Sequence, residues 1–188
     1  MKKKMSINTL VLCSLFAALI AAGAVAGTML PIRFGPISIT FQGLFVLLTG
    51  FIMGKRLGPI TVILYIMIGL LGIPVFANFG SGFGYVLSPT FGFLLGFIPM
   101  SYVTARIAGN DNPSYLRLFV ASLVARIPLY LIGLTYFYLI KNFYLGQTFG
   151  MGKVFYFCFI LFIPSDTLSQ IISIVLAKRL IPITKKML

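Results

Sequence analysis

Long apolar runs, separated by short polar or glycine-rich connections, dominate the chain. Six of these runs approach or exceed the about 20 helical residues that cross a bilayer core. The connections are too short to hold a soluble domain. We therefore expect an all-α membrane protein with six transmembrane helices, forming a single integral membrane domain over residues 1–188. The expected helices cover residues 7–27, 37–53, 57–73, 86–105, 118–140 and 154–176.

The basic residues are distributed unevenly over the two sides that six spans define. The chain has 15 lysines and arginines against two acidic residues, and a net charge of +13. The positive-inside rule then places both termini in the cytoplasm, and contact with anionic lipids accounts for the basic balance without nucleic acid. The side of the termini holds Lys2, Lys3, Lys4, Lys55, Arg56, Arg106, Arg117, Lys178, Arg179, Lys185 and Lys186, and the opposite side holds Arg33, Lys141 and Lys153.

The composition removes most enzyme classes. Hydrophobic residues make up 60% of the chain, and the mean hydropathy is +1.08. The chain has no histidine, and its acidic residues are Asp111 and Asp166. Zinc sites, paired carboxylates and Ser-His-Asp triads cannot be built from these residues alone. We expect neither an enzyme nor a metal site, and we expect Cys13 and Cys158, both in apolar runs, to be buried thiols without a redox role.

An uncharged, glycine-rich segment, GIPVFANFGSGFGYVLSPTFG, covers residues 72–92 on the expected outer side. Glycine permits close backbone approach, and aromatic rings supply flat apolar surface. Residues 74–86 are therefore predicted to form an extracellular lid over a small, partly apolar ligand. A re-entrant structural turn is the alternative interpretation.

Two ionisable residues lie deep within apolar runs. Arg126 and Asp166 both fall near the middle of the membrane, where charged groups are costly and usually face a cavity or each other. We expect Asp166 to accept hydrogen bonds from ligand N–H groups and Arg126 to hold a ligand carboxylate, so that the pair grips the two ends of a small acid. A purely structural Arg126–Asp166 pair is the alternative. Further polar groups predicted to line the same cavity are Gln42, Asn78, Tyr85, Ser88, Thr90 and Tyr130.

The first apolar run is rich in alanine at helical spacing. Ala17 and Ala21 are four residues apart, as are Ala18 and Ala22. Small side chains on one face let another helix approach closely, and lipid supplies no hydrophobic drive for association. These four alanines are therefore candidates for docking a partner helix, and packing within the chain is the alternative.

Three stretches resemble the BioY family, the biotin-specific S components of energy-coupling factor (ECF) transporters. They are GPISITFQ at residues 35–42, the central stretch 65–97, and the weaker pair 130–137 and 162–170. The resemblance implies a six-helix protein that captures a vitamin from outside and delivers it through a transmembrane T subunit and two cytosolic ATPases. It also implies that Gln42, Asn78, Tyr85 and Asp166 lie in or near the biotin pocket, and that small residues of the first helix dock the T subunit. Biotin, or a similar acid, is then a transported ligand, and no cofactor is expected.

One departure from the family pattern concerns the last apolar run. The family has a lysine three residues after the aspartate, whereas this chain has Ser169. A carboxylate in a low-dielectric cavity requires a compensating donor. We expect Arg126 to replace the lysine, and the ligand to be biotin or a related acid such as lipoate or dethiobiotin. An autonomous secondary carrier is the rival function, because six spans with mid-membrane charges also suit one.

Overall fold

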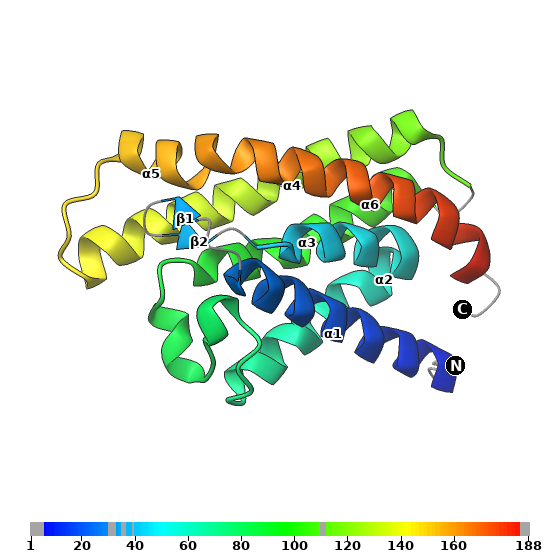
Figure 1. The fold of residues 1–188 in the computed structure, drawn as a ribbon, viewed down its shortest axis with the longest axis horizontal. Helices are drawn as coiled ribbons and strands as arrows, with labels where there is room; N and C mark the ends of the chain where they lie inside the picture. Colours follow the sequence, from blue (N-terminus) through cyan, green and yellow to red (C-terminus); the bar gives the residue numbers. More distant parts are fainter. Residues whose placement is uncertain (1–5, 30–32, 35–36, 39, 110–111, 185–188) are drawn as a thin grey trace.

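The computed structural model describes residues 6–29, 33–34, 37–38, 40–109 and 112–184. Lys2, Lys3, Lys4, Asp111, Lys185 and Lys186, used above in the sequence argument, lie outside these residues. The described part is a helical bundle in which the start of α1 and the end of α6 lie at the same end (Figure 1). The helices are α1 (Ile7–Met29), α2 (Gln42–Leu70), α3 (Phe91–Ala108), α4 (Tyr115–Leu139), α5 (Met151–Cys158) and α6 (Ile163–Thr184).

Short irregular elements connect the helices. Strands β1 (Arg33–Phe34) and β2 (Ile37–Ser38) pair antiparallel between α1 and α2. Two 3₁₀ turns, Ala77–Phe79 and Phe83–Leu87, lie between α2 and α3. A π-helical turn, Ile140–Tyr144, extends α4, and a 3₁₀ turn, Ile160–Phe162, joins α5 to α6.

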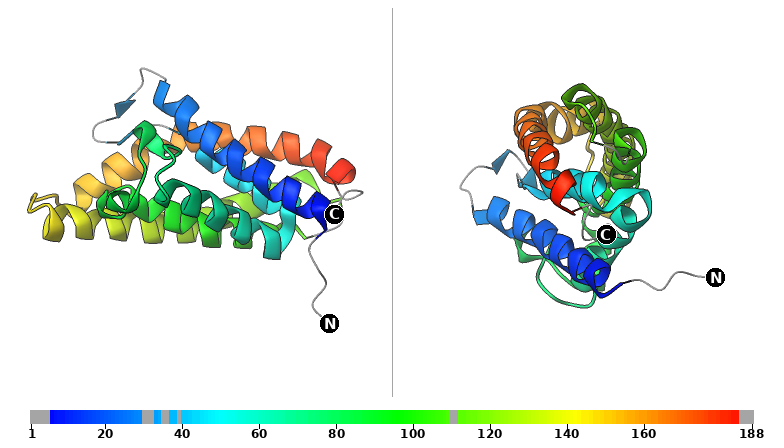
Figure 2. Two further views of the ribbon diagram at one scale, coloured as in Figure 1. Left: turned by 90° about the horizontal axis from the view of Figure 1, so that it is seen from below. Right: turned by 90° about the vertical axis from the view of Figure 1, so that its right-hand side faces the viewer.

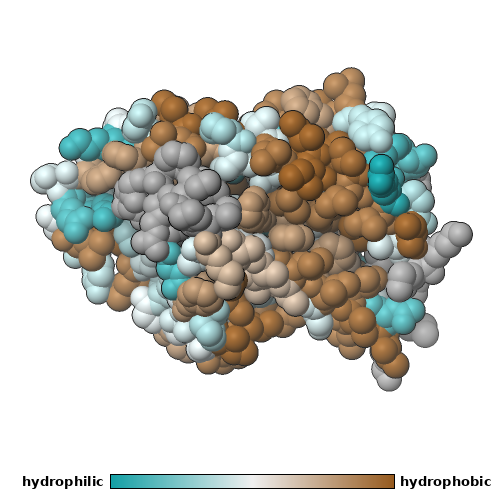
Figure 3. Space-filling model, in the orientation of Figure 1, coloured by the Kyte–Doolittle hydropathy of each residue, from teal (hydrophilic) through white to brown (hydrophobic). Residues whose placement is uncertain are grey.

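Among the residues that the structure describes, five helical segments are long and apolar enough to cross a membrane. They are residues 7–29, 42–70, 91–108, 115–144 and 151–184. The surface agrees with this, because an apolar band lies between hydrophilic groups at the two ends of the molecule (Figure 3). The molecule is thus all-α apart from the small hairpin. Four of the six expected spans correspond to single segments, and the other two fall within α2.

Helix α2 bends sharply at Gly54, whose φ of 75° and ψ of −179° are not helical. Glycine adopts positive φ readily because it has no Cβ. A Cβ built on Gly58 lies 3.5 Å from the Gly50 Cα. Residues eight apart in a straight helix are about 12 Å apart. The arms 42–53 and 55–70 therefore fold back on each other and coincide closely with the second and third expected spans.

Two expected boundaries are wrong. Residues 37–38, expected at the start of the second span, form strand β2, which fits the β-branched Ile37, and α2 begins only at Gln42. Residues 86–90 belong to the loop before α3, and not to a membrane helix. At the other end, α2 ends at Leu70, and Gly72, two residues before Pro74, has a φ of 104° that a helix does not allow.

Close helix contacts hold the bundle together. A Cβ on Gly50 would lie 2.7 Å from the Ser101 carbonyl oxygen, and one on Gly96 would lie 2.9 Å from that of Leu129. Glycine therefore allows α3 to approach both α2 and α4 at backbone distance. Seen from the end that carries both termini, the helices form a compact ring (Figure 2).

Helix α1 packs one face on α2 and leaves the other exposed. Ala17 is only 2% exposed and lies in the core beside Cys13 and Ile20. The Ala17 side chain packs within the chain, which is the alternative given for the alanines of this run, and it offers no exposed surface to a partner in this conformation. Ala18 and Ala22 are exposed and Ala21 is half-buried, so their docking role stays a prediction.

Candidate functional site

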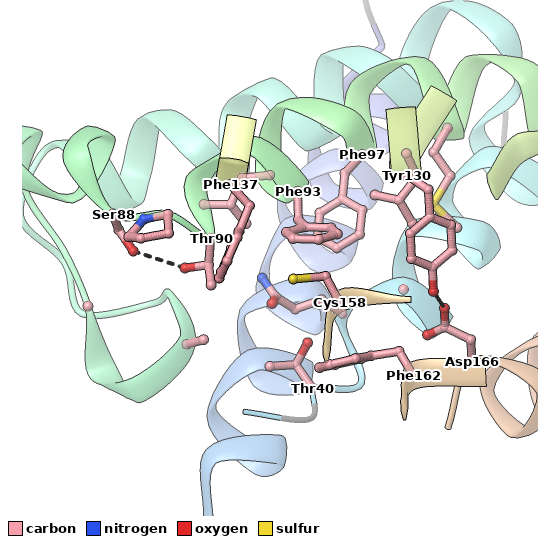
Figure 4. Close-up of a pocket in the computed structure, with 18 of the residues that line it drawn as sticks. Thr40, Ser88, Thr90, Phe93, Phe97, Tyr130, Phe137, Cys158, Phe162 and Asp166 are labelled. Carbon is pink, nitrogen blue, oxygen red and sulfur yellow. Dashed lines mark hydrogen bonds between the residues drawn. The ribbon is translucent and has the colours of Figure 1, made fainter. Parts of the chain in front are cut away.

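A cavity of about 360 Å³ lies between α2, α3, α4, the α5–α6 segment and the loop after α2 (Figure 4). This volume is within the range of small-molecule sites. Polar side chains gather at two ends, and aromatic rings lie between them. All eight residues predicted from the sequence line this cavity: Gln42, Asn78, Tyr85, Ser88, Thr90, Arg126, Tyr130 and Asp166.

One end, which we call the Asp166 end, combines α4 with the start of α6. The Tyr130 hydroxyl donates to Asp166 Oδ2, and Arg126 Nη2 donates to the Asp166 backbone carbonyl oxygen. Ser169, where the sequence resemblance leads one to expect a lysine, is buried and lines the same cavity. The polar groups of this end thus come from two helices and include one guanidinium and one carboxylate.

The structure places Arg126 and Asp166 side by side, whereas the sequence analysis expected them to hold opposite ends of a ligand. Arg126 and Tyr130 are one turn apart on α4, and both contact Asp166. Their contacts place the guanidinium and the carboxylate together at one end of the cavity. A ligand whose ring lay at this end would therefore bind with its other end to different residues of the cavity.

A break in the last span positions Asp166. Helix α5 ends at Cys158, Phe159 adopts φ −124° and ψ −63°, and α6 begins only at Ile163. Asp166 then falls in the first turn of α6, where backbone N–H groups and the helix dipole favour a carboxylate. Cys158 and Phe162, on either side of the break, also line the cavity.

The middle of the cavity is aromatic. Figure 4 shows Phe93 and Phe97 of α3 between the Tyr130–Asp166 pair and the opposite end. Phe137 of α4 lies on the same side as Thr90. Flat apolar walls of this kind pack well against an apolar ring or chain but bind polar groups only weakly.

The opposite end, which we call the lid end, is built by the loop of residues 71–90. Ala77, Asn78, Gly80 and Tyr85 line the cavity from this loop. Ser88 Oγ lies 3.0 Å from Thr90 Oγ1, and the Tyr85 hydroxyl lies 3.4 Å from the same oxygen. Burial raises the pKa of Tyr85 above its ordinary range, so that its hydroxyl stays neutral at physiological pH.

A buried ring fixes the loop over the cavity. Phe76 is fully buried, with its ring centroid 5.7 Å from that of Tyr65 and 4.7 Å from that of Tyr85. Gln42 Nε2 donates to the Tyr65 hydroxyl at 2.7 Å, and that hydroxyl donates to the Val75 carbonyl at 3.0 Å. The predicted lid residue Asn78 donates its backbone N–H to Thr28 Oγ1 of α1 at 2.9 Å.

Lys141 also lines the cavity, and the sequence analysis did not select it. It was counted there only as a charge on the outer side. Its place directly after the fifth apolar run was the available signal, because a lysine at the end of a span can lean back along the helix. Lys141 lies within the π-helical turn 140–144, a local structure often found at functional sites.

The several apolar helices define a multi-pass membrane protein, and its cavity has the size of a small-molecule site. Residues 1–186 match the BioY family, and the chain belongs to that family. The family is one of transporters, which confirms that the chain is not an enzyme.

Curated relatives and a solved structure agree with this membership. The chain is 36% identical to the probable biotin transporter BioY of Lysinibacillus sphaericus, over 96% of this chain and 90% of the relative. It is 31% identical to the biotin transporter BioY of Thermotoga maritima, over 91% and 94% of the two chains. A crystal structure of the S-component for biotin from an ECF-type ABC transporter has the same fold, with a TM-score of 0.73, 21% identity and 94% of each chain covered.

Proposed function

We propose that this protein is the substrate-binding S component of an ECF-type importer, which captures biotin outside the cell and delivers it to an ATP-driven module. The observation that carries the proposal is the single cavity that collects all eight predicted residues and joins two polar ends through an aromatic middle. A fused polar ring with an apolar chain and a terminal carboxylate matches that sequence of environments. In this role biotin is the transported ligand, and no cofactor or nucleic acid takes part.

At the Asp166 end, Asp166 accepts hydrogen bonds from the ring N–H groups of the ligand, and Arg126 supplies the cation that the family has as lysine. The support for this role of Arg126 is its position, because Arg126 contacts Asp166 and Ser169 lines the same cavity. A guanidinium donates through a planar fork and stays charged in a low-dielectric site. Lipoate and dethiobiotin share the carboxylate and the chain with biotin and are the alternative ligands.

The proposed topology has six spans, counted with α2 as two arms, and places both termini in the cytoplasm. The end of the bundle where α1 begins and α6 ends also carries the bend within α2, the end of α3 and the start of α4 (Figure 1). Exposed cations accompany these turns, which is the distribution expected for the cytoplasmic side. They are Lys55, Arg56, Arg106, Arg117 and Arg179.

The proposed partners are a transmembrane T subunit and two cytosolic ATPases, together with the surrounding lipid. Helix α1 supplies the docking surface through Ala18, Ala21 and Ala22, of which Ala18 and Ala22 are exposed on its outer face. Small side chains at this spacing let a partner helix approach closely. An autonomous secondary carrier would use the same cavity without these partners.

Two measurements test the proposal. In native mass spectrometry, protein in nanodiscs that is offered biotin, lipoate and dethiobiotin at equal concentration should retain biotin preferentially. Preferential retention of another of these acids would identify that acid as the ligand instead. Biotin uptake should then require T and ATPase subunits in cells that lack other biotin transporters. Sustained uptake by this chain alone would favour the secondary carrier.

A further inference from the structure

We propose that Lys141 binds the carboxylate of the ligand at the lid end of the cavity. This inference rests on the proposed function, because it concerns how the same cavity holds its acid. It separates two electrostatic tasks, with the ring of the ligand at the Asp166 end and its anionic end at Lys141.

Two cations line the cavity among the residues that the structure describes, and their surroundings differ. Arg126 donates to the Asp166 carbonyl beside the Tyr130–Asp166 hydrogen bond, so it belongs to the end suited to a polar ring. Lys141 lies fifteen residues further along the same helical segment. The carboxylate of an extended ligand, directed away from Asp166, therefore reaches the neighbourhood of Lys141 and not that of Arg126.

The Lys141 side chain leans back along α4 toward the cavity. Its Nζ lies 6.0 Å from the ring centroid of Phe137, which is one turn earlier and lines the cavity. This is the direction that side chains take on a helix. Tyr130 and Phe137 are seven residues apart, about 10 Å along the axis, so the distance to be spanned is that of a small acid with a short chain.

The described partners of the ammonium are neutral groups. Lys141 Nζ donates to Gln147 Oε1 at 2.8 Å and lies 5.9 Å from the ring centroid of Phe149 as well as near Phe137. An ammonium has three N–H donors, and a charged acceptor is a stronger partner than an amide oxygen. Because the Gln147 amide is neutral, a ligand carboxylate can join or replace it as the partner of the ammonium.

The backbone supports this placement. Lys141 lies in the π-helical turn Ile140–Tyr144, and Leu145, directly after the turn, lines the cavity too. The Asn142 side chain accepts from the Phe149 N–H at 2.8 Å and donates to the Tyr138 and Phe149 carbonyl oxygens. The turn and the following loop are thus held in a defined shape, which fixes the level at which the ammonium meets the cavity.

The test compares biotin with its neutral primary amide, biotinamide, on purified protein in nanodiscs. Wild type should bind the acid at least tenfold more tightly than the amide, because a charged hydrogen bond is stronger than a neutral one. Lys141→Gln should lose that preference, with affinity for biotin falling about tenfold or more and affinity for biotinamide almost unchanged. Lys141→Arg should keep the preference for the acid, which separates the role of the charge from any effect on folding.

Two controls isolate the lid end. Lys153→Gln removes an exposed cation outside the cavity lining and should leave both affinities unchanged. Arg126→Gln should weaken acid and amide alike, because it alters the ring end. If wild type binds biotin but Lys141→Gln keeps its preference for the acid, the inference is overturned and the proposed function stands. If wild type binds neither compound, the proposed function fails, and this inference fails with it.

Discussion

A single methyl group on α2 should loosen the lid without touching a cavity side chain. Gly69 lies at the end of α2 directly under Phe76, and a Cβ built there would overlap the Phe76 ring. That ring is fully buried between Tyr65 and Tyr85, so it cannot move without displacing the loop. Gly69→Ala should therefore oppose the closed position of the lid.

The magnitude follows from comparing closed and open lids. Inserting a methyl group into packed surroundings costs about 1–3 kcal/mol, and this cost applies only while Phe76 occupies its place over residue 69. The gain of up to about 1 kcal/mol from replacing glycine in a helix applies to both states and cancels. Ligand release should therefore accelerate about 5- to 150-fold, whereas overall thermal stability changes little.

The assay is the dissociation rate of labelled biotin, chased with excess unlabelled biotin, from protein in nanodiscs. Gly84→Ala is the matched control, because Gly84 lies in the same loop, is exposed, and has no atom within 4 Å of an added Cβ. The control should leave the rate within about twofold of wild type. An unchanged rate for Gly69→Ala, or an equal acceleration in both variants, would refute the assignment of this loop as the lid.

Two further predictions concern docking and the Asp166 end. The double substitution Ala18→Leu and Ala22→Leu should abolish uptake by the assembled transporter and leave the affinity for biotin within about twofold of wild type. Both alanines are exposed on α1 and lie outside the cavity lining. Normal uptake would exclude this face as the docking surface. In calorimetric titrations, Arg126→Gln should weaken biotin binding by about 2 kcal/mol. Adding Ser169→Lys to this variant should recover most of the loss. No recovery would show that Arg126 does not replace the family lysine.

The lining of the cavity was predictable from the sequence because polar groups within apolar runs must avoid lipid. Gln42, Arg126, Tyr130 and Asp166 were found in this way, and the glycine-rich loop supplied the others. The relation between Arg126 and Asp166 was not predictable. It depends on the break at Phe159, which sets the depth of α6 relative to α4 and leaves no trace in an uninterrupted apolar pattern.

Two other misses have the same kind of cause. Helix α1 is apolar on all sides, so its sequence does not distinguish the face that packs on α2 from the face toward lipid, and the burial of Ala17 was unforeseen. Lys141 was counted only as a charge on the outer side, because a basic residue after an apolar run usually marks a membrane boundary. The π-helical turn that brings it to the cavity is a feature of the backbone, which residue spacing alone does not specify.

Irregular backbone and the cavity coincide in this molecule. Within a bilayer, non-helical segments are tolerated where they are buried in protein or line a cavity. The break at Phe159 is flanked by the cavity residues Cys158 and Phe162, and the π-helical turn carries Lys141. Two of the places where helical hydrogen bonding is interrupted therefore border the cavity. A ligand that fills the cavity would supply contacts there that the helices do not supply to each other, and because it binds only the folded protein, its affinity and the thermal stability of the bundle should rise together across a series of related acids.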